Sequence, residues 1–68
     1  MIELHAEAPK IIVPLFARTL PELTAQAAAA QRADAADLVE LRLDPLPRQD
    51  WLTALAQVRA AITKPLIV

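Results

Sequence analysis

Charged side chains that can bind a small polar molecule alternate with apolar ones in the segment Asp37–Asp44, DLVELRLD. This alternation is typical of a β-strand. It predicts that Glu40 and Arg42 project from one face and that Asp44 follows at the C-terminal end of the strand. The first face also carries Leu38, and the opposite, apolar face carries Val39, Leu41 and Leu43. A guanidinium forms forked, charge-assisted hydrogen bonds with carboxylates and polyols, and a carboxylate beside it can orient it and accept from ligand hydroxyls. The pattern therefore favours a binding site for a small hydroxylated acid, although it does not by itself identify a catalyst.

An alternative interpretation of the same strand is a solvent-facing strand whose charges only maintain solubility. The preceding apolar segment Lys10–Phe16, KIIVPLF, has no matching polar face. Because a solvated sheet face would show on both strands, the comparison favours a binding role for Glu40 and Arg42.

Strands and helices are predicted to alternate along the chain. Strands are expected at about 10–16, 37–44 and 65–68, and helices at about 20–33 and 50–62. This order, with short connections, is typical of right-handed parallel βαβ units in an α/β protein. Pro14 lacks the N–H that a sheet ladder needs, so it should lie near a strand end or beside an unpaired stretch.

Local signals predict the ends of the first helix. Thr19 and Glu22 form a capping box, in which Glu22 reaches back to the cap, and Pro21 falls in the first turn. The chain contains no glycine, so Asp34 is expected to take the left-handed position after the helix. The inward stripe of this helix is expected to contain Leu20, Leu23, Ala27 and Ala30.

The second helix is expected to begin at an Asp50 N-cap, with Trp51 as the residue that anchors it. Its inward face is predicted to carry Leu52, Leu55, Val58 and Ile62.

The composition excludes several classes of protein. A net charge of −1 argues against a surface for nucleic acid or an anionic membrane. The chain has no cysteine, and the single histidine, His5, cannot build a zinc centre alone. No apolar run reaches the roughly 18–20 residues of a membrane span, and Met1–Lys10 has no basic region typical of a signal peptide. These features indicate a soluble, cytoplasmic polypeptide.

The length of 68 residues makes a self-sufficient fold difficult, because three parallel strands with two helices leave one sheet face and two edges uncovered. We therefore expect the chain to be the N-terminal fragment of one larger domain. The alternative is a small standalone α/β module that covers its sheet by self-association and has no catalytic activity.

The succession of APKIIVPL, a capped helix, ADLVELRLD, a second helix and KPLIV is similar to the N-terminal part of type I 3-dehydroquinate dehydratase. The resemblance runs from about Ala8 to Val68, roughly a quarter of a (β/α)₈ barrel. It implies that the chain is the β-α-β-α-β N-terminal segment of a TIM barrel. The implied activity is that of a lyase of the shikimate pathway, which makes precursors of aromatic amino acids. It converts 3-dehydroquinate to 3-dehydroshikimate through a Schiff base on a lysine, with a histidine as acid and base, and without metal or organic cofactor.

The resemblance also assigns roles to residues of this chain. It implies that Glu40 and Arg42 bind the substrate, with Leu41 between them in the same segment. The resemblance implies that the substrate is the small molecule 3-dehydroquinate and that the protein is a homo-oligomer, a dimer in the family. No catalytic residue is expected in this chain, since the lysine and the histidine belong to later strands.

Several residues depart from the family pattern or have two interpretations. Pro14 stands where some members carry a serine that contacts the substrate, and the N-terminal hairpin of some barrels is shortened to Met1–Pro9 or lost. Lys10, Lys64 and His5 precede strands and inherit no catalytic role. Two further side chains each have two interpretations. Arg18 either attracts an anionic substrate or is a solvated loop cation. Asp44 either orients a side chain such as Arg42 or caps the Pro45 loop.

Overall fold

The computed structural model describes residues 10–68, so the expectations for His5 and Met1–Pro9 lie outside the described residues. In chain order the elements are β1 (Ile12–Leu15), α1 (Leu20–Arg32), β2 (Leu38–Leu41), the 3₁₀ turn η2 (Arg48–Asp50), α2 (Trp51–Ala61) and β3 (Leu66–Ile67). This is the predicted β-α-β-α-β order of an α/β protein. Each hydrogen-bonded strand is shorter than the segment expected for it.

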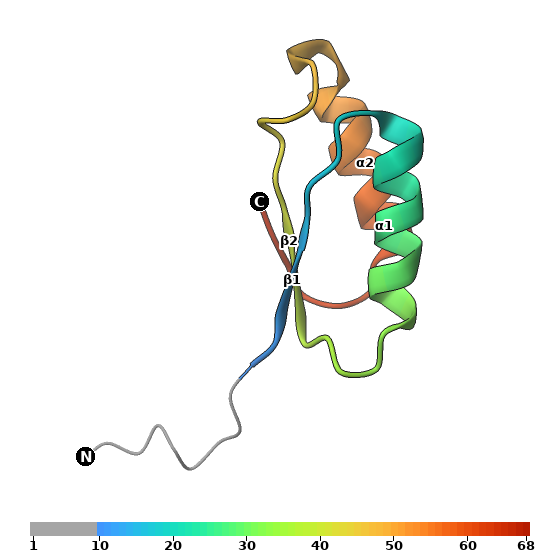
Figure 1. The fold of residues 1–68 in the computed structure, drawn as a ribbon, viewed down its shortest axis with the longest axis vertical. Helices are drawn as coiled ribbons and strands as arrows, with labels where there is room; N and C mark the ends of the chain where they lie inside the picture. The colour runs from blue at the N-terminus through green and yellow to red at the C-terminus, as the bar shows by residue number, and fades with distance from the viewer. Residues whose placement is uncertain (1–9) are drawn as a thin grey trace, which may run out of the picture.

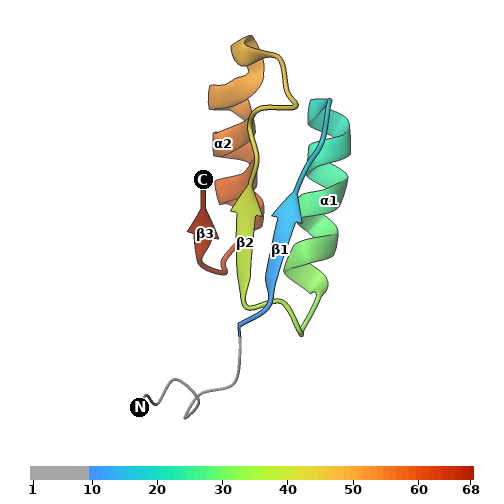
Figure 2. The same ribbon diagram turned by 60° about the vertical axis from the view of Figure 1, so that its left-hand side comes forward.

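The three strands form one parallel sheet in the order β1-β2-β3, as the arrows in Figure 2 show. Val13 lies opposite Val39 and Leu15 opposite Leu41, and Leu66 lies opposite Val39 on the other side of β2. Both helices cover the same face of this sheet (Figure 1). The parallel pairing predicted from the sequence is therefore confirmed, and within residues 10–68 the second face of the sheet is uncovered.

The core lies between the sheet and the two helices. Val39 and Leu41 are buried and Leu43 packs against them, which confirms the alternation predicted for this strand. The predicted stripe of α1 is also confirmed, because Leu20 packs against the core and the other three residues are buried. The buried residues contributed by the helices are Leu23, Ala27, Ala30, Ala54 and Val58.

The predicted inward face of α2 is wrong at one position. Leu52 is 83% exposed, whereas Ala54 is completely buried. Leu55 is partly buried, and Val58 and Ile62 belong to the core as expected. The two helices pack against each other on one side of the sheet, and Ala54 belongs to the buried core cluster. The helix is thus turned so that its alanine, rather than its first leucine, meets the core.

The N-terminus of α1 is capped by its own first turn. The Thr19 hydroxyl accepts from the Glu22 N–H at 3.3 Å, as predicted. The Glu22 carboxylate accepts from the N–H of Arg18 at 2.8 Å, so it reaches one residue beyond the cap instead of the cap itself.

The C-terminus of α1 is capped by a distant residue. The expectation of a left-handed Asp34 is wrong, because no residue in 10–68 has a positive φ and the helix ends on an extended Ala33. Instead, the Lys64 ammonium donates to the carbonyl of Ala30 at 2.9 Å and also to that of Ala33. A cation at this position also interacts favourably with the helix dipole.

The start of α2 differs from the expected Asp50 cap. Asp50 has a helical backbone and its side chain makes no capping hydrogen bond, because a 3₁₀ turn leads directly into the helix. Trp51 packs against the core, and its indole N–H donates to the Leu46 carbonyl at 3.1 Å. The predicted anchoring role of Trp51 is therefore confirmed.

Pro14 lies in β1, opposite Glu40. On either side of it, the carbonyl of Ile11, just before β1, accepts from the Leu38 N–H at 3.1 Å, and the Leu15 carbonyl accepts from the Arg42 N–H at 3.1 Å. Successive residues of a strand bond to opposite sides, so the nitrogen of Pro14, which is adjacent to Leu15, faces away from β2. The missing N–H therefore falls at the edge of the described sheet, as the sequence predicted.

Candidate functional site

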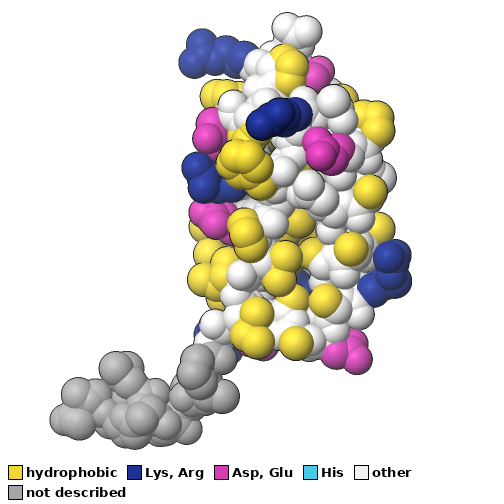
Figure 3. Space-filling model, in the orientation of Figure 1, with side chains coloured by type: hydrophobic (Ala, Val, Ile, Leu, Met, Phe, Trp, Pro, Cys, Tyr) yellow, Lys and Arg dark blue, Asp and Glu magenta, His cyan; other side chains and the backbone are white. Residues whose placement is uncertain are grey.

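All three strands point toward the same end of the sheet (Figure 2). Near that end, the polar side chains of β2 and of the segment that follows it lie on the uncovered face. They border an open depression of about 290 Å³, lined by Glu40, Leu41, Arg42, Leu43, Asp44 and Val68. In Figure 3, charged side chains of both signs lie on the upper left of the molecule, whereas hydrophobic side chains gather over the lower parts of β1 and α1. The depression thus combines a cation and carboxylates at the C-terminal edge of a parallel sheet.

Arg42 is held by three contacts. Its backbone N–H donates to the Leu15 carbonyl, which fixes its position relative to β1. One guanidinium nitrogen, Nη2, lies 3.3 Å from Oδ2 of Asp44 in an ion pair. The guanidinium carbon lies 5.8 Å from the centroid of the Phe16 ring. Two roles were considered for Asp44, and the structure shows the one in which its carboxylate orients Arg42.

Glu40 occupies the middle of the uncovered face and is half-buried. Its cross-strand neighbours are Pro14 on β1 and Ile67 on β3. Within residues 10–68 its carboxylate makes no hydrogen bond or ion pair, and the carboxylate that orients Arg42 is that of Asp44. The oxygens of Glu40 are therefore able to accept hydrogen bonds from a ligand.

Leu41 borders the depression but is only 1% exposed, because its side chain packs into the core under the helices. Arg18 lies exposed on the loop after β1, and its side chain forms no ion pair with the described residues. Neither side chain joins the cluster formed by Glu40, Arg42 and Asp44.

The two lysines of the described chain lie away from this depression. Lys10 and Lys64 precede β1 and β3, so they lie at the opposite end of the strands from Arg42. The Lys64 ammonium donates hydrogen bonds to backbone carbonyls at the C-terminal end of α1.

Phe16, Val68 and Gln26 were not singled out from the sequence. Phe16 shares strand parity with Pro14, so alternation places it on the uncovered face, and the parallel register brings it beside Arg42. Gln26 comes from α1, and its amide lies at the end of β1 nearest Phe16.

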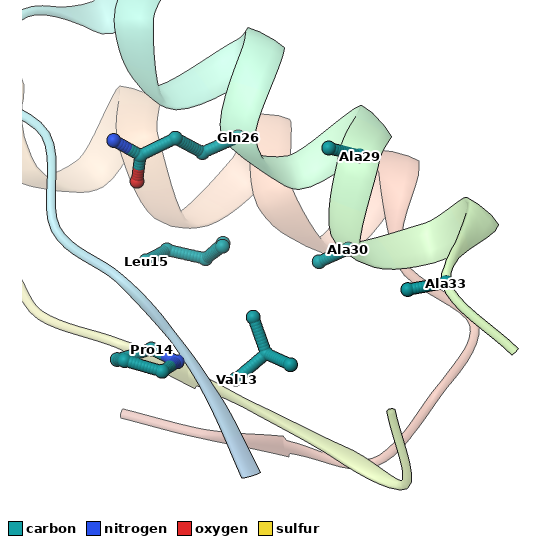
Figure 4. Close-up of a pocket in the computed structure, with 7 residues that line it drawn as sticks. All are labelled: Val13, Pro14, Leu15, Gln26, Ala29, Ala30 and Ala33. Carbon is teal, nitrogen blue, oxygen red and sulfur yellow. The ribbon is translucent and has the colours of Figure 1, made fainter. Parts of the chain in front are cut away.

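A second, apolar hollow of about 290 Å³ lies between β1 and α1. Figure 4 shows Val13 and Leu15 pointing from the strand toward Ala29, Ala30 and Ala33 of the helix, with Pro14 on the strand and Gln26 at one end. The residues that line it carry no charge, and it lies at the free edge of the described sheet. It is therefore suited to apolar packing and not to catalysis or to binding of a charged ligand.

The fold and the site together define an α/β protein with a parallel sheet that presents charged side chains at the C-terminal edge of its strands. Residues 11–68 match the family model of type I 3-dehydroquinase, which covers nearly all of the described chain. The chain belongs to the type I 3-dehydroquinase family. No significant match is found among curated proteins or among solved structures.

Membership indicates the general activity of the family to which the chain belongs. Type I 3-dehydroquinases are lyases of the shikimate pathway that dehydrate dehydroquinate, a small-molecule substrate. In the part of the chain that the structure describes, no helix has the length and apolar character needed to cross a membrane.

Proposed function

We propose that this chain forms the first part of a (β/α)₈ barrel that converts 3-dehydroquinate to 3-dehydroshikimate, and that Glu40 and Arg42 bind the substrate. The observation that supports the proposal most directly is the position of the Arg42 guanidinium in an open depression at the C-terminal end of β2. In (β/α)₈ barrels this end of the strands carries the active site.

The two side chains have complementary tasks in the proposal. Arg42 binds a carboxylate or a pair of oxygens through parallel N–H donors, which fits an anionic substrate. Glu40 accepts from substrate hydroxyls, for which its unoccupied oxygens are suited. The main chain of Leu41 spaces the two charges on one face, while its side chain stabilises the strand from below.

The bond-breaking groups of the proposed reaction lie outside this segment. The proposed mechanism uses a lysine that forms a Schiff base with the substrate and a histidine that transfers protons, with no metal or organic cofactor. Lys10 and Lys64 do not fill the first role, because both precede strands and Lys64 caps α1. In this proposal the residues come from later strands of the barrel, and the complete enzyme is a cytoplasmic homodimer.

The test uses the product of the complete reading frame and the variant Arg42→Ala. We expect the affinity for 3-dehydroquinate, measured by isothermal titration calorimetry, to fall about 10- to 100-fold, as for loss of charge-assisted hydrogen bonds. Turnover, followed through the ultraviolet absorbance of the conjugated product, should fall as well.

The matched control is Arg59→Ala. It removes the same charge from an exposed position on α2, away from the depression, and should leave both quantities unchanged. Unchanged affinity and turnover in Arg42→Ala would overturn the role assigned to Arg42.

A second candidate function is a self-associating module without catalytic activity. It is favoured by Ile12 and Ile67, which are 49% and 45% exposed on the uncovered sheet face. Size-exclusion chromatography with light scattering separates the two candidates on the 68-residue chain. One folded oligomer with a cooperative melting transition supports the module, whereas an aggregated or unfolded chain supports the barrel segment.

A further inference from the structure

We infer that Phe16 is a positioning residue for Arg42: its ring holds the guanidinium in place while leaving the N–H groups free for an anionic ligand. The inference rests on the proposed function, because it concerns the same binding site. It assigns a positioning role to the residue that directly follows β1, a strand that contributes no charged side chain to the depression.

The geometry of the pair fits a cation–π contact. The guanidinium carbon lies 5.8 Å from the centroid of the Phe16 ring. Such contacts are attractive within about 6 Å of the ring centroid, because the face of the ring carries negative charge density. Phe16 is nevertheless 52% exposed, so core packing does not account for its position.

The ring and the carboxylate beside Arg42 act differently on the donors of the guanidinium. Arginine has five N–H donors in a fixed fork. The Asp44 carboxylate engages Nη2, whereas the ring of Phe16 accepts no conventional hydrogen bond. Phe16 thus restricts the orientation of the guanidinium without competing for the donors that a ligand carboxylate needs.

Phe16 itself is fixed from α1 through its main chain. Its N–H donates to Oε1 of Gln26 at 2.8 Å, and its carbonyl accepts from Nε2 of the same side chain at 3.1 Å. The preceding carbonyl, of Leu15, accepts from the N–H of Arg42 at 3.1 Å. The backbone that carries the ring is therefore tied both to α1 and to the residue that the ring contacts.

The test compares Phe16→Leu, which keeps an apolar side chain but removes the ring, with Phe16→Tyr, which keeps the ring. We use the product of the complete reading frame and 3-dehydroquinate as the ligand. Phe16→Leu should weaken binding about 2- to 5-fold, the range expected for one partly exposed cation–π contact, and Phe16→Tyr should restore it.

A spectroscopic signature distinguishes positioning from general stability. In the wild-type protein the ring current of Phe16 should shift the NMR resonance of the Arg42 Nε–H, and Phe16→Leu should abolish this shift. Phe16→Tyr should preserve it. Leu52→Ala, at an apolar position that is 83% exposed on α2, is the control and should change neither the shift nor the affinity.

The outcomes separate the inference from the function on which it rests. If Arg42→Ala weakens binding while Phe16→Leu changes neither affinity nor the Arg42 resonance, the inference is overturned and the proposed function stands. If Arg42→Ala leaves binding unchanged, both fail.

Discussion

At the scale of single residues, alternation along β2 and the residues after it separates charged side chains from packed apolar ones. Glu40 and Arg42 lie on the uncovered face, and Val39 and Leu41 are buried beneath the helices. Period-two alternation was sufficient to predict this division from the sequence. It was not sufficient to predict Phe16, because the contact with Arg42 depends on the register between two strands as well as on parity.

Asp44→Asn tests how much the ion pair with Arg42 contributes to stability. The two side chains are 45% (Arg42) and 65% (Asp44) exposed, so solvent screens their attraction strongly. We expect the free energy of unfolding, measured by urea titration, to fall by less than about 1 kcal/mol. A loss of several kcal/mol would show that the pair supports the fold rather than the orientation of one side chain.

At the scale of elements, local signals predicted where α1 begins but not what completes its end. The Thr19 cap depends on residues within one turn, which sequence reasoning can examine. The cap at the other end comes from Lys64, far along the chain, so no local pattern indicates it. The exposure of Leu52 on α2 has a similar explanation. Hydropathy favours the burial of leucine, but the orientation of the helix against the core buries Ala54 instead.

Lys64→Met should destabilise the product of the complete reading frame, because it removes a donor from the carbonyls of Ala30 and Ala33 and a cation from the end of α1. We expect a loss of about 1–2 kcal/mol in the free energy of unfolding, measured in urea. Lys10→Met removes an exposed lysine before β1 and serves as the control. Equal effects of the two substitutions would contradict the capping role.

A pair of substitutions in α2 tests which of its residues meets the core. Ala54→Leu overfills a completely buried position and should lower the free energy of unfolding by about 1–3 kcal/mol. Leu52→Ala removes an exposed side chain and should change it by no more than about 0.5 kcal/mol. The reverse ranking in thermal or urea unfolding would restore the orientation of α2 predicted from the sequence.

At the scale of the whole molecule, the sequence predicted a parallel sheet with helices on one side, and the structure has this arrangement (Figure 1). The prediction succeeded because three apolar segments separated by two helical segments permit few other connections. The closure of a barrel is a relation between this sheet and further strands, so the proposal for the complete enzyme depends on the family rather than on residues 10–68 alone.

The uncovered face predicts the solution behaviour of the 68-residue chain by itself. Exposed apolar side chains such as Ile12, together with two free strand edges, favour association between copies. Ile12→Lys places a charge on this face and should reduce the average mass measured by light scattering at a given concentration. If the wild-type chain is monomeric at concentrations of about 100 μM, a range in which exposed edges associate, the face does not drive association.

The connection between Lys64 and the end of α1 also has a consequence for biosynthesis. The Lys64 ammonium lies 34 positions along the chain from Ala30, whose carbonyl it satisfies. Ribosomes add about 5–20 residues per second, so the last turn of α1 waits seconds for its partner to be made. We therefore expect the first helix of a nascent chain to remain frayed at its end until the whole second helix has been translated.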